Sequence, residues 1–331
     1  MLEAVPGSEE QVLAFLAEAP DEFVSGEAIS DKLGLSRAAV WKHVNALRSM
    51  GYRIDAVPAR GYRLVEIPDR VGPLEIGPLL HTQEIGQVLH CFDELPSTSD
   101  HLKELAEQDG VHGEVVVAER QTAGRGRRGR AWVSPAGRNL YLSVLLRPQL
   151  PPQRAPELTL VAAVAVCEAC RQAGVEATIK WPNDVLVGER KVAGILTELS
   201  AEPDQVHWVV LGLGVNLNAE EEDFPEDLRD GATSLALERA QPVPRALFAA
   251  ALLSLLEQWL ERHAGEGFAP VRAAWRERCS TLGQAVRVEV EGGEITGVAE
   301  DVDETGALLV RHAGGLARIF SGDVRKARPA R

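Results

Sequence analysis

The spacing of hydrophobic residues divides the chain into three stretches. Up to about residue 64, apolar residues recur every three or four positions, as in short amphipathic helices, and then alternate as in strands. The stretch 79–280 mixes helical and strand patterns and includes a strong helical period over 247–263. Beyond it, short alternating runs between glycine turns are typical of a small β-barrel. We therefore expect three domains, 1–66, 67–280 and 281–331, with a proline- and glycine-rich linker over 67–78.

The first stretch predicts a helix-turn-helix with a two-stranded wing. Helical patterns over 26–33 and from Ser36 onward are separated by Gly34, which suits a tight turn. In this motif the N-terminal end of the second helix of the pair enters the major groove of DNA. A small helical protein-interaction module is the alternative. The expected DNA-binding residues are Ser36, Arg37, Ala38, Lys42, Asn45 and Arg60, with Arg48 and Arg63 near phosphates.

Trp41 does not suit this polar face, and we expect it to pack against the wing rather than to contact a base.

Composition limits the class of protein. The 331 residues are 45% hydrophobic and 25% charged, which is ordinary for a globular chain, and no apolar run is long enough to span a bilayer. No secretory signal pattern precedes the first helix, so a cytoplasmic location is expected. The formal net charge of −14 argues against general coating of nucleic acid, although a local basic surface remains compatible with it.

The four cysteines do not predict a metal site. Only Cys167 and Cys170 have metal-like spacing, and no second pair of ligands completes a zinc site. They lie in an alanine-rich helical pattern, so we expect buried thiols in a reducing compartment.

The densest cluster of positive charge is Gly124–Arg130, with the sequence Gly-Arg-Gly-Arg-Arg-Gly-Arg. Arginine donates several planar hydrogen bonds and stays ionised, and glycine lets backbone amides approach the same ligand, so this loop predicts a polyanionic ligand. Its three glycines also fit the dinucleotide-binding pattern, but the following Ala131–Pro135 is a poor helix start, so we regard that match as accidental. A solvated, mobile turn is the alternative.

Four other segments carry polar residues where ligands often bind, and each has a structural alternative. Ser97-Thr-Ser99 precedes a helix, which needs only one hydroxyl as its cap. Lys180-Trp-Pro-Asn-Asp184 ends a strand, where its last two residues could simply form the turn. Lys191 begins an apolar strand, where it could be solvated. Gly212-Leu-Gly-Val-Asn216 places two glycines in a strand, a pattern that permits close approach of a ligand or of another backbone segment.

Together and in this order, these motifs resemble those of the bifunctional biotin–protein ligase and biotin operon repressor family, over nearly the whole chain. The resemblance implies an α+β protein. Its parts would be a winged helix-turn-helix, a central α/β ligase domain with a mixed sheet like that of class II aminoacyl-tRNA synthetases and biotin–lipoate ligases, and a C-terminal SH3-like barrel. It implies biotin, ATP and Mg²⁺ (bound with ATP only) as ligands. The implied partners are the biotin carboxyl carrier protein of acetyl-CoA carboxylase, operator DNA and, with adenylate bound, a second copy of the chain.

The resemblance also implies roles for particular residues in two steps, formation of biotinyl-5'-AMP and transfer of biotin to a carrier lysine. The implied catalytic residues are Lys191, Arg127 and Asp184, with Asp184 orienting Lys180 or assisting the incoming lysine. The implied biotin-binding residues are Ser97, Thr98, Ser99, Gln121, Arg125, Gly126, Arg127, Lys191, Gly194, Gly212 and Gly214. The implied ATP-binding residues are Arg125, Arg127, Arg128, Arg130, Trp132, Lys180, Asn183, Lys191 and Asn216.

Two departures from the family leave contacts unassigned. The segment expected to cover adenine, residues 231–235, has no tryptophan, and both Arg325 and Lys326 are candidates for a C-terminal basic contact. Two other functions remain open from sequence: a lipoate-type ligase, and a regulator that binds biotinyl-AMP without transferring it.

Overall fold

The computed structural model describes residues 8–19, 21–290 and 293–327, and the chain divides into two compact units, Met1–Asp69 and Arg70–Arg331. Each unit has its own hydrophobic core. No helix in the described ranges is both long and apolar enough to cross a bilayer.

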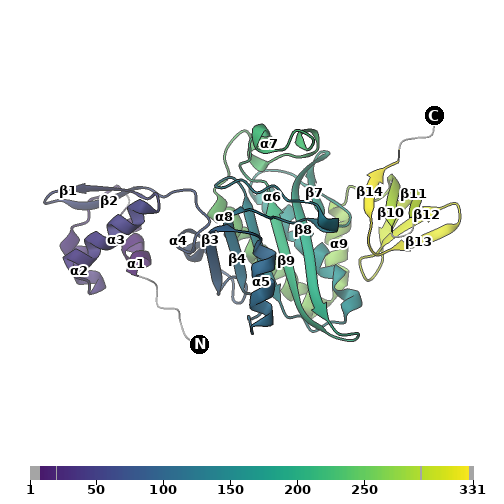
Figure 1. The fold of residues 1–331 in the computed structure, drawn as a ribbon, viewed down its shortest axis with the longest axis horizontal. Helices are drawn as coiled ribbons and strands as arrows, with labels where there is room; N and C mark the ends of the chain where they lie inside the picture. Colours follow the sequence, from purple (N-terminus) through teal and green to yellow (C-terminus); the bar gives the residue numbers. More distant parts are fainter. Residues whose placement is uncertain (1–7, 20, 291–292, 328–331) are drawn as a thin grey trace. The chain divides into compact units, whose positions relative to one another are not determined.

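The first unit is a winged helix-turn-helix, as the hydrophobic spacing predicts (Figure 1). Ser36 accepts a hydrogen bond from the amide of Ala39 and so caps the third helix, and Gly34 ends the second helix at φ 66°. Val40, Val44 and Leu47 are fully buried along one side of the third helix. Its elements are α1 (Ser8–Ala17), α2 (Gly26–Leu33), α3 (Arg37–Ser49), β1 (Arg53–Val57) and β2 (Gly61–Glu66).

Trp41 contradicts the expectation that it packs against the wing. Its side chain is 61% exposed, because position 41 lies beside, and not within, the stripe of α3 that carries the buried Val40, Val44 and Leu47.

The second unit is built on a seven-stranded mixed sheet with the order β3-β4-β5-β9-β8-β7-β6. The β3–β4 pairing is parallel, and the other neighbouring pairs of this sheet are antiparallel. The strands are β3 (Leu89–Leu95), β4 (Val115–Gln121), β5 (Leu140–Leu146), β6 (Thr178–Lys180), β7 (Asp184–Val187), β8 (Arg190–Ala201) and β9 (Val206–Val215).

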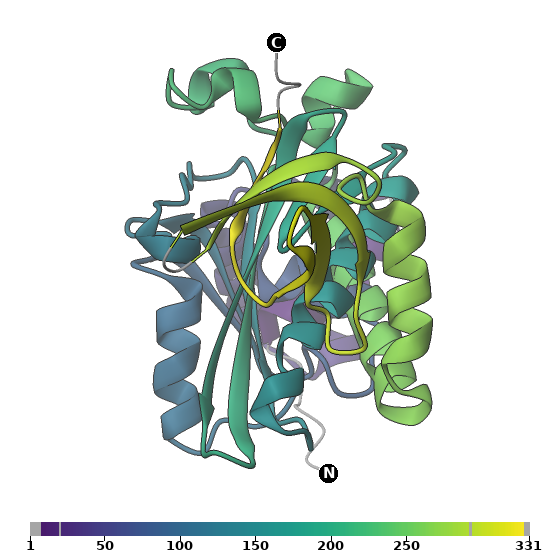
Figure 2. The same ribbon diagram turned by 90° about the vertical axis from the view of Figure 1, so that its right-hand side faces the viewer.

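Helices cover both faces of this sheet (Figures 1 and 2). Successive strand residues point to opposite faces, so Val115 and Val117 join the larger core while Val116 packs with Leu102 of α5. The larger core includes α6 (Pro156–Gln172), α8 (Arg245–Glu266) and α9 (Phe268–Arg278), and the opposite face carries α5 (Thr98–Glu107). The helix expected over 247–263 is therefore confirmed as α8.

The two cysteines with metal-like spacing lie on α6 as buried free thiols, as expected. Burial raises the pKa of Cys167 to about 12, so this thiol stays protonated.

The expected linker over 67–78 is only partly a linker. Its second half forms α4 (Pro73–Ile76) and the 3₁₀ turn η1 (Gly77–Leu79), and both Val71 and Ile76 are buried in the core of the second unit. The Glu119 carboxylate accepts a hydrogen bond from the backbone amide of Val71 at 2.9 Å. The burial of Val71 and Ile76 therefore decides the structure of this segment more than its proline and glycine content does.

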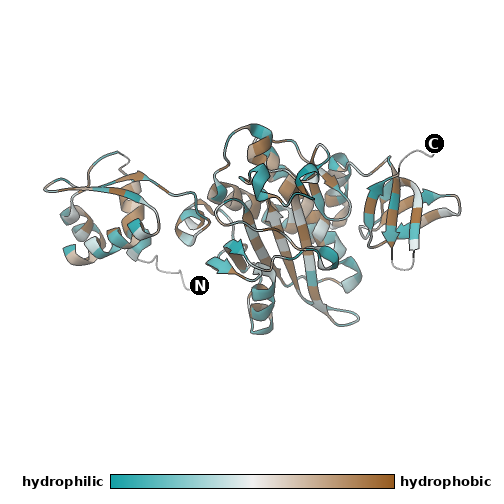
Figure 3. Ribbon diagram, turned by 45° about the horizontal axis from the view of Figure 1, so that its top comes forward, coloured by the Kyte–Doolittle hydropathy of each residue, from teal (hydrophilic) through white to brown (hydrophobic). Residues whose placement is uncertain are grey.

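The C-terminal part of the second unit is a five-stranded antiparallel sheet with the order β13-β12-β11-β10-β14. Apolar and polar positions alternate in bands along its strands (Figure 3). The last strand pairs with β10 and carries residues into the candidate site. The strands are β10 (Ala285–Val290), β11 (Gly293–Val302), β12 (Leu308–His312), β13 (Gly315–Ile319) and β14 (Asp323–Lys326).

Candidate active site

A cavity of about 540 Å³ in the second unit collects the residues that the sequence singles out. Its walls come from the start of α5, the β4–β5 loop, the strands β6 to β9 and the C-terminal β14. Every residue expected to bind biotin or ATP lines it except Arg128. Segments far apart in the sequence are thus brought to one place by the sheet.

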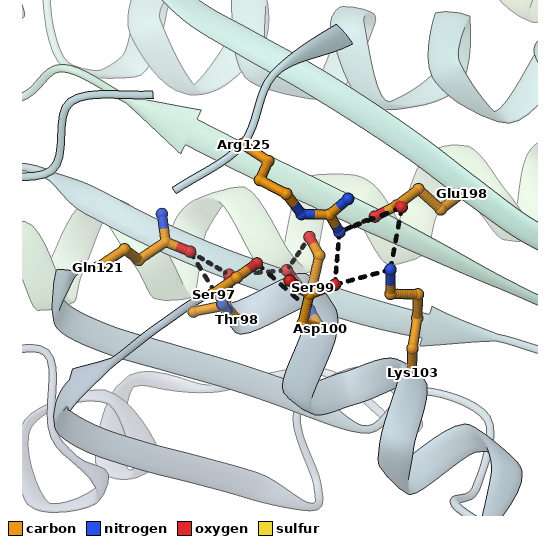
Figure 4. Close-up of polar contacts among 9 residues, drawn as sticks. Ser97, Thr98, Ser99, Asp100, Lys103, Gln121, Arg125 and Glu198 are labelled. Atoms are coloured by element: carbon orange, nitrogen blue, oxygen red, sulfur yellow. Dashed lines mark hydrogen bonds and ion pairs between the residues drawn. The ribbon is translucent and has the colours of Figure 1, made fainter. Parts of the chain in front are cut away.

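One wall of the cavity is neutral and polar. Ser97 caps α5 (Figure 4), while the hydroxyls of Thr98 and Ser99 lie 2.9 and 3.0 Å from Ser143 Oγ. Gln121 Oε1 accepts hydrogen bonds from the backbone amide and the hydroxyl of Thr98. The two hydroxyls expected to be spare therefore already have protein partners. Sequence reasoning missed Ser143, although a serine within the apolar run Leu140–Leu146 was a signal for it.

Three glycines bring the sheet close to neighbouring side chains. A Cβ atom on Gly212 would lie 2.6 Å from Ser99 Oγ, and one on Gly214 would lie 2.5 Å from the Trp132 ring. A Cβ on Gly194 would lie 3.0 Å from the same ring. Ser99 and Trp132 thus occupy the space that these glycines leave open.

Lys191 is paired with Asp184 inside the cavity. Its Nζ lies 2.5 Å from Asp184 Oδ1 and 5.3 Å from the centre of the Trp132 ring. No ion pair joins Asp184 to Lys180 in the described part of the chain, although the two residues are backbone partners across β6 and β7. The Asp184 carboxylate therefore faces Lys191 of the neighbouring strand β8, and its expected role toward Lys180 or the incoming lysine stays a prediction.

The arginine loop, Gly124–Arg130, joins β4 to β5, as predicted, and it is folded back on itself. Trp132 donates its amide to Gly124 O at 2.9 Å, and Gly126 donates its amide to Arg130 O at 2.7 Å. Arg128 adopts a left-handed φ of 57° between these pairs. The loop is therefore a hydrogen-bonded turn.

Each guanidinium of the loop has a partner within the protein. Arg125 is 2.6 Å from Asp100 and 2.8 Å from Glu198, in a cluster that Lys103 completes (Figure 4). Arg127 donates to Asn183 Oδ1 at 3.2 Å, and burial lowers the pKa of its guanidinium. Arg128 and Arg130 both contact Asp323 of β14.

These two arginines stabilise the charged form of the Asp323 carboxylate. Burial alone would raise its pKa, but Arg130 and Arg128 outweigh burial and lower the pKa below its usual range. The C-terminal sheet thereby holds the arginine loop.

The two asparagines of the cavity fix its backbone. Asn183 Nδ2 donates to Ile195 O at 2.7 Å, and Asn216 Nδ2 donates to Thr233 O at 3.0 Å. Thr233 in turn donates its amide to Lys191 O at 2.9 Å. Asn216 thus holds the segment 231–235 beside the lysine.

Other lining residues were missed or left undecided. Phe224 and Leu228 form part of the wall before segment 231–235, and an apolar pair in an acidic loop was a weak signal. Of the two C-terminal candidates, Arg325 lines the cavity, whereas Lys326 forms an ion pair with Glu189.

In the first unit, the expected DNA-contact residues lie on the exposed side of α3 and in the wing. Ala38 and Lys42 are exposed, Arg37 pairs with Glu27 at 3.0 Å, and Ser36 and Asn45 flank them along the helix. Arg60 stacks on Phe23 at 4.3 Å.

Arg48 and Arg63 are held within the unit instead of being free for phosphates. Arg48 donates to Ile54 O at 2.9 Å, and Arg63 lies 2.7 Å from Asp55.

The second unit combines a mixed sheet, a cationic loop over a cavity and an antiparallel β-sheet, and the first unit is a winged helix-turn-helix. Together these parts define a class of protein, a ligase joined to a DNA-binding fold. Family models agree. The Biotin/lipoate A/B protein ligase family matches residues 91–216, an HTH domain matches 8–63, and the Biotin protein ligase C terminal domain matches 281–326.

Relatives narrow the class. The chain is 40% identical to the Bifunctional ligase/repressor BirA of Bacillus subtilis (strain 168), over 95% of this chain and 97% of that protein. It is 33% identical to BirA of Escherichia coli (strain K12), over 95% of each. A biotin protein ligase from Aquifex aeolicus in complex with biotin and ATP is 31% identical, with a TM-score of 0.64 over 72% of this chain and 99% of that one. The chain belongs to the bifunctional biotin ligase/repressor family.

Proposed function

We propose that this chain forms biotinyl-5'-AMP from biotin and ATP and transfers biotin to a lysine of the biotin carboxyl carrier protein of acetyl-CoA carboxylase. We also propose that the adenylate-bound chain represses biotin biosynthesis genes. The observation that carries the proposal is the convergence of Arg125, Arg127, Arg130 and Lys191 on one cavity whose other wall is neutral. Relatives named as ligase/repressors and a neighbour with biotin and ATP support it.

The two walls of the cavity suit different parts of the substrates of the first reaction, the ureido ring of biotin on one side and the reacting carboxylate and phosphates on the other. Ser97, Thr98, Ser99 and Gln121 offer neutral donors and acceptors for the ureido ring of biotin, and Gly212 and Gly214 allow close approach. The arginine loop, from Arg125 and Gly126 to Arg130, offers fixed positive charge to the biotin carboxylate and the phosphates. Trp132, Lys180 and Asn216 would complete the nucleotide side.

Lys191 would act where the bond forms. The biotin carboxylate attacks the α-phosphorus of ATP, pyrophosphate leaves, and negative charge gathers on the bridging oxygens. Such a reaction depends on positioning and charge neutralisation and needs no protein nucleophile. Lys191 would leave its ion pair with Asp184 and contact these oxygens instead, and Gly194 would leave room for its side chain. Arg127 would neutralise the same charge.

Asp184 would then be free to accept a proton from the incoming carrier lysine, whose amine attacks the carbonyl of the adenylate and releases AMP. The proton must leave that amine, and a carboxylate near the reacting carbonyl is a suitable acceptor.

Binding of biotin and ATP would also replace the carboxylate partners of the loop arginines. The contacts of Arg125 with Asp100 and Glu198, and of Arg128 and Arg130 with Asp323, would give way to contacts with anionic ligands. A loop closed over the adenylate would exclude water from a hydrolysable anhydride. Mg²⁺ would enter with ATP, near Asn183 and Asn216, whose amide oxygens suit a hard cation.

For repression we propose operator contacts from Ser36, Arg37, Ala38, Lys42, Asn45 and Arg60. We further propose a homodimer formed by pairing of a sheet edge of the second unit, which would present two helices to two half-sites.

Labelling of an acceptor tests the ligase function directly. The full chain is incubated with labelled biotin, ATP, Mg²⁺ and a carrier domain, alongside a carrier whose acceptor lysine is replaced by arginine. Label on the unaltered carrier alone is expected. Absence of label from both carriers, with adenylate formed, would favour the non-transferring regulator. Pyrophosphate release with lipoate but not with biotin would favour the lipoate-type ligase.

Repression is tested by gel shift at fixed salt, with sedimentation run in parallel. Dimers and operator binding should both require biotin plus ATP. Equal binding without them would contradict adenylate-dependent repression.

A further inference from the structure

The exposed indole of Trp41 has no role in the fold of the first unit. Its side chain is 61% exposed, the highest fraction among the large apolar side chains described. Within the described ranges, no hydrogen bond, ion pair or ring contact involves it. An apolar surface of this size on a recognition helix calls for a partner that covers it.

The surroundings of Trp41 are polar and cationic. Arg37 and Asn45 lie one turn before and one turn after it on the same face of α3, and Lys42 follows it. The sequence of α3 contains no acidic residue. The face therefore complements a polyanion rather than the apolar core of a protein interface.

The direction of the side chain places the indole near the end of α3 that meets DNA. Side chains on a helix lean toward its N-terminus, so the indole extends over the turn that contains Ala38. Ala38 is small and exposed, and it leaves the approach to the ring open. The N-terminal turn is also the part of a recognition helix that enters the major groove.

We propose that Trp41 reads sequence in the operator by packing its indole on the 5-methyl group of a thymine in the major groove. That methyl is the one apolar group on a base edge there, and apolar side chains recognise it by contact. This inference rests on the proposed DNA binding of the first unit. It makes Trp41 a specificity residue, distinct from the basic residues that contact phosphates in any sequence.

The experiment begins with selection of a binding sequence from random duplexes, using the full chain with biotin, ATP and Mg²⁺. Affinities for the selected and for an unrelated duplex are then measured over a range of salt for the wild type, Trp41→Ala, Trp41→Phe and Lys42→Gln. Each thymine of the selected site is replaced in turn by uracil, which removes only the methyl group. Met50→Ala, an exposed apolar residue at the far end of α3, is the matched control, and circular dichroism checks folding.

Trp41→Ala should lose about ten- to a hundredfold in affinity for the selected site, as for one lost base contact per half-site. Its affinity for unrelated DNA and its salt dependence should stay as in the wild type, because the indole neutralises no phosphate. Trp41→Phe should retain part of the preference. Lys42→Gln should instead weaken both duplexes and lower the salt slope by about one per subunit. One uracil position should weaken wild-type binding about fourfold, as expected for one buried methyl, and have no effect on Trp41→Ala.

Four outcomes would overturn the inference. If Trp41→Ala binds the selected site like the wild type, the indole reads no base. If it weakens both duplexes equally, Trp41 is a general contact and not a specificity residue. If every uracil position acts alike in both proteins, the indole contacts no thymine methyl group. If the wild type selects no sequence and binds no duplex, DNA binding itself fails, and Trp41 faces a protein partner instead.

Discussion

Lys191 lies with its ammonium 2.5 Å from the Asp184 carboxylate and above the Trp132 ring, at the centre of the arginine-rich cavity. Its side chain is about one-third exposed, so it contributes little to the core. Its contribution is therefore the positive charge of its ammonium group, which lies where negative charge would develop during adenylation.

Lys191→Ala should slow adenylate formation by about 10²- to 10³-fold, as for the loss of one preorganised electrostatic contact. The melting temperature should change little. Pyrophosphate release in a single turnover measures the first effect and circular dichroism the second. Lys32→Ala, on an exposed position of α2, is the control. An unchanged adenylation rate would remove Lys191 from the mechanism.

Gly214 is a residue at which a single methyl group should be costly. Its added Cβ would lie 2.5 Å from the Trp132 indole, so Gly214→Ala should displace the ring and lower affinity for ATP. Overpacking of this kind costs about 1–3 kcal/mol, which corresponds to roughly five- to 150-fold. Calorimetric titration with ATP measures it.

Gly265→Ala is the matched control, because nothing lies within 4 Å of its added Cβ in α8. It should leave ATP affinity unchanged and stabilise the helix slightly. Equal ATP affinities in the two variants would show that the ring is not held against Gly214.

At the scale of elements, α6 and α8 are joined by a buried carboxylate. Glu157 of α6 lies 2.6 Å from His263 of α8 and is also bonded to Arg154. Burial would raise the pKa of Glu157, but the hydrogen bonds from His263 and Arg154 outweigh it and lower that pKa.

A lowered folded-state pKa gives stability that is present above the unfolded value, about 4.3, and is lost as pH falls through the folded value. Unfolding free energy should therefore decline below about pH 4.5, and Glu157→Gln should flatten this decline. Urea denaturation at several pH values measures it. Glu261→Gln, on the exposed side of α8, should leave the slope as it is. Identical slopes in wild type and Glu157→Gln would disprove the contribution.

Elements with strong periodicity could be predicted from sequence, and those formed by distant contacts could not. The helix over 247–263 and the capped helix after Ser36 follow from local spacing and hydroxyl chemistry. The strand β14 is only four residues long, and pairing with β10 rather than its own pattern makes it a strand. The α4 turn within the expected linker depends likewise on a core that local sequence does not reveal.

At the scale of the molecule, the two units should unfold separately. All residues proposed for biotin and ATP lie in the second unit, so ligands that bind only its folded state should stabilise that unit alone. Scanning calorimetry should show two transitions, of which biotin plus ATP raises one. At ligand concentrations a hundred times Kd, the gain is about 2.7 kcal/mol. A shift of both transitions by the same amount would show that the units unfold together.

The sequence alone determined the motifs, their order and the chemistry that they carry. Residue types such as four arginines on a glycine loop restrict the charge of the ligand, whatever the position of that loop in the fold. It also determined the winged helix, whose contacts are mostly local. The tertiary structure decided which partners these residues have. Asp184 faces Lys191, Asp323 holds Arg128 and Arg130, and Trp41 is exposed. These pairings depend on strand order and on packing between distant segments, which no local pattern of residues encodes.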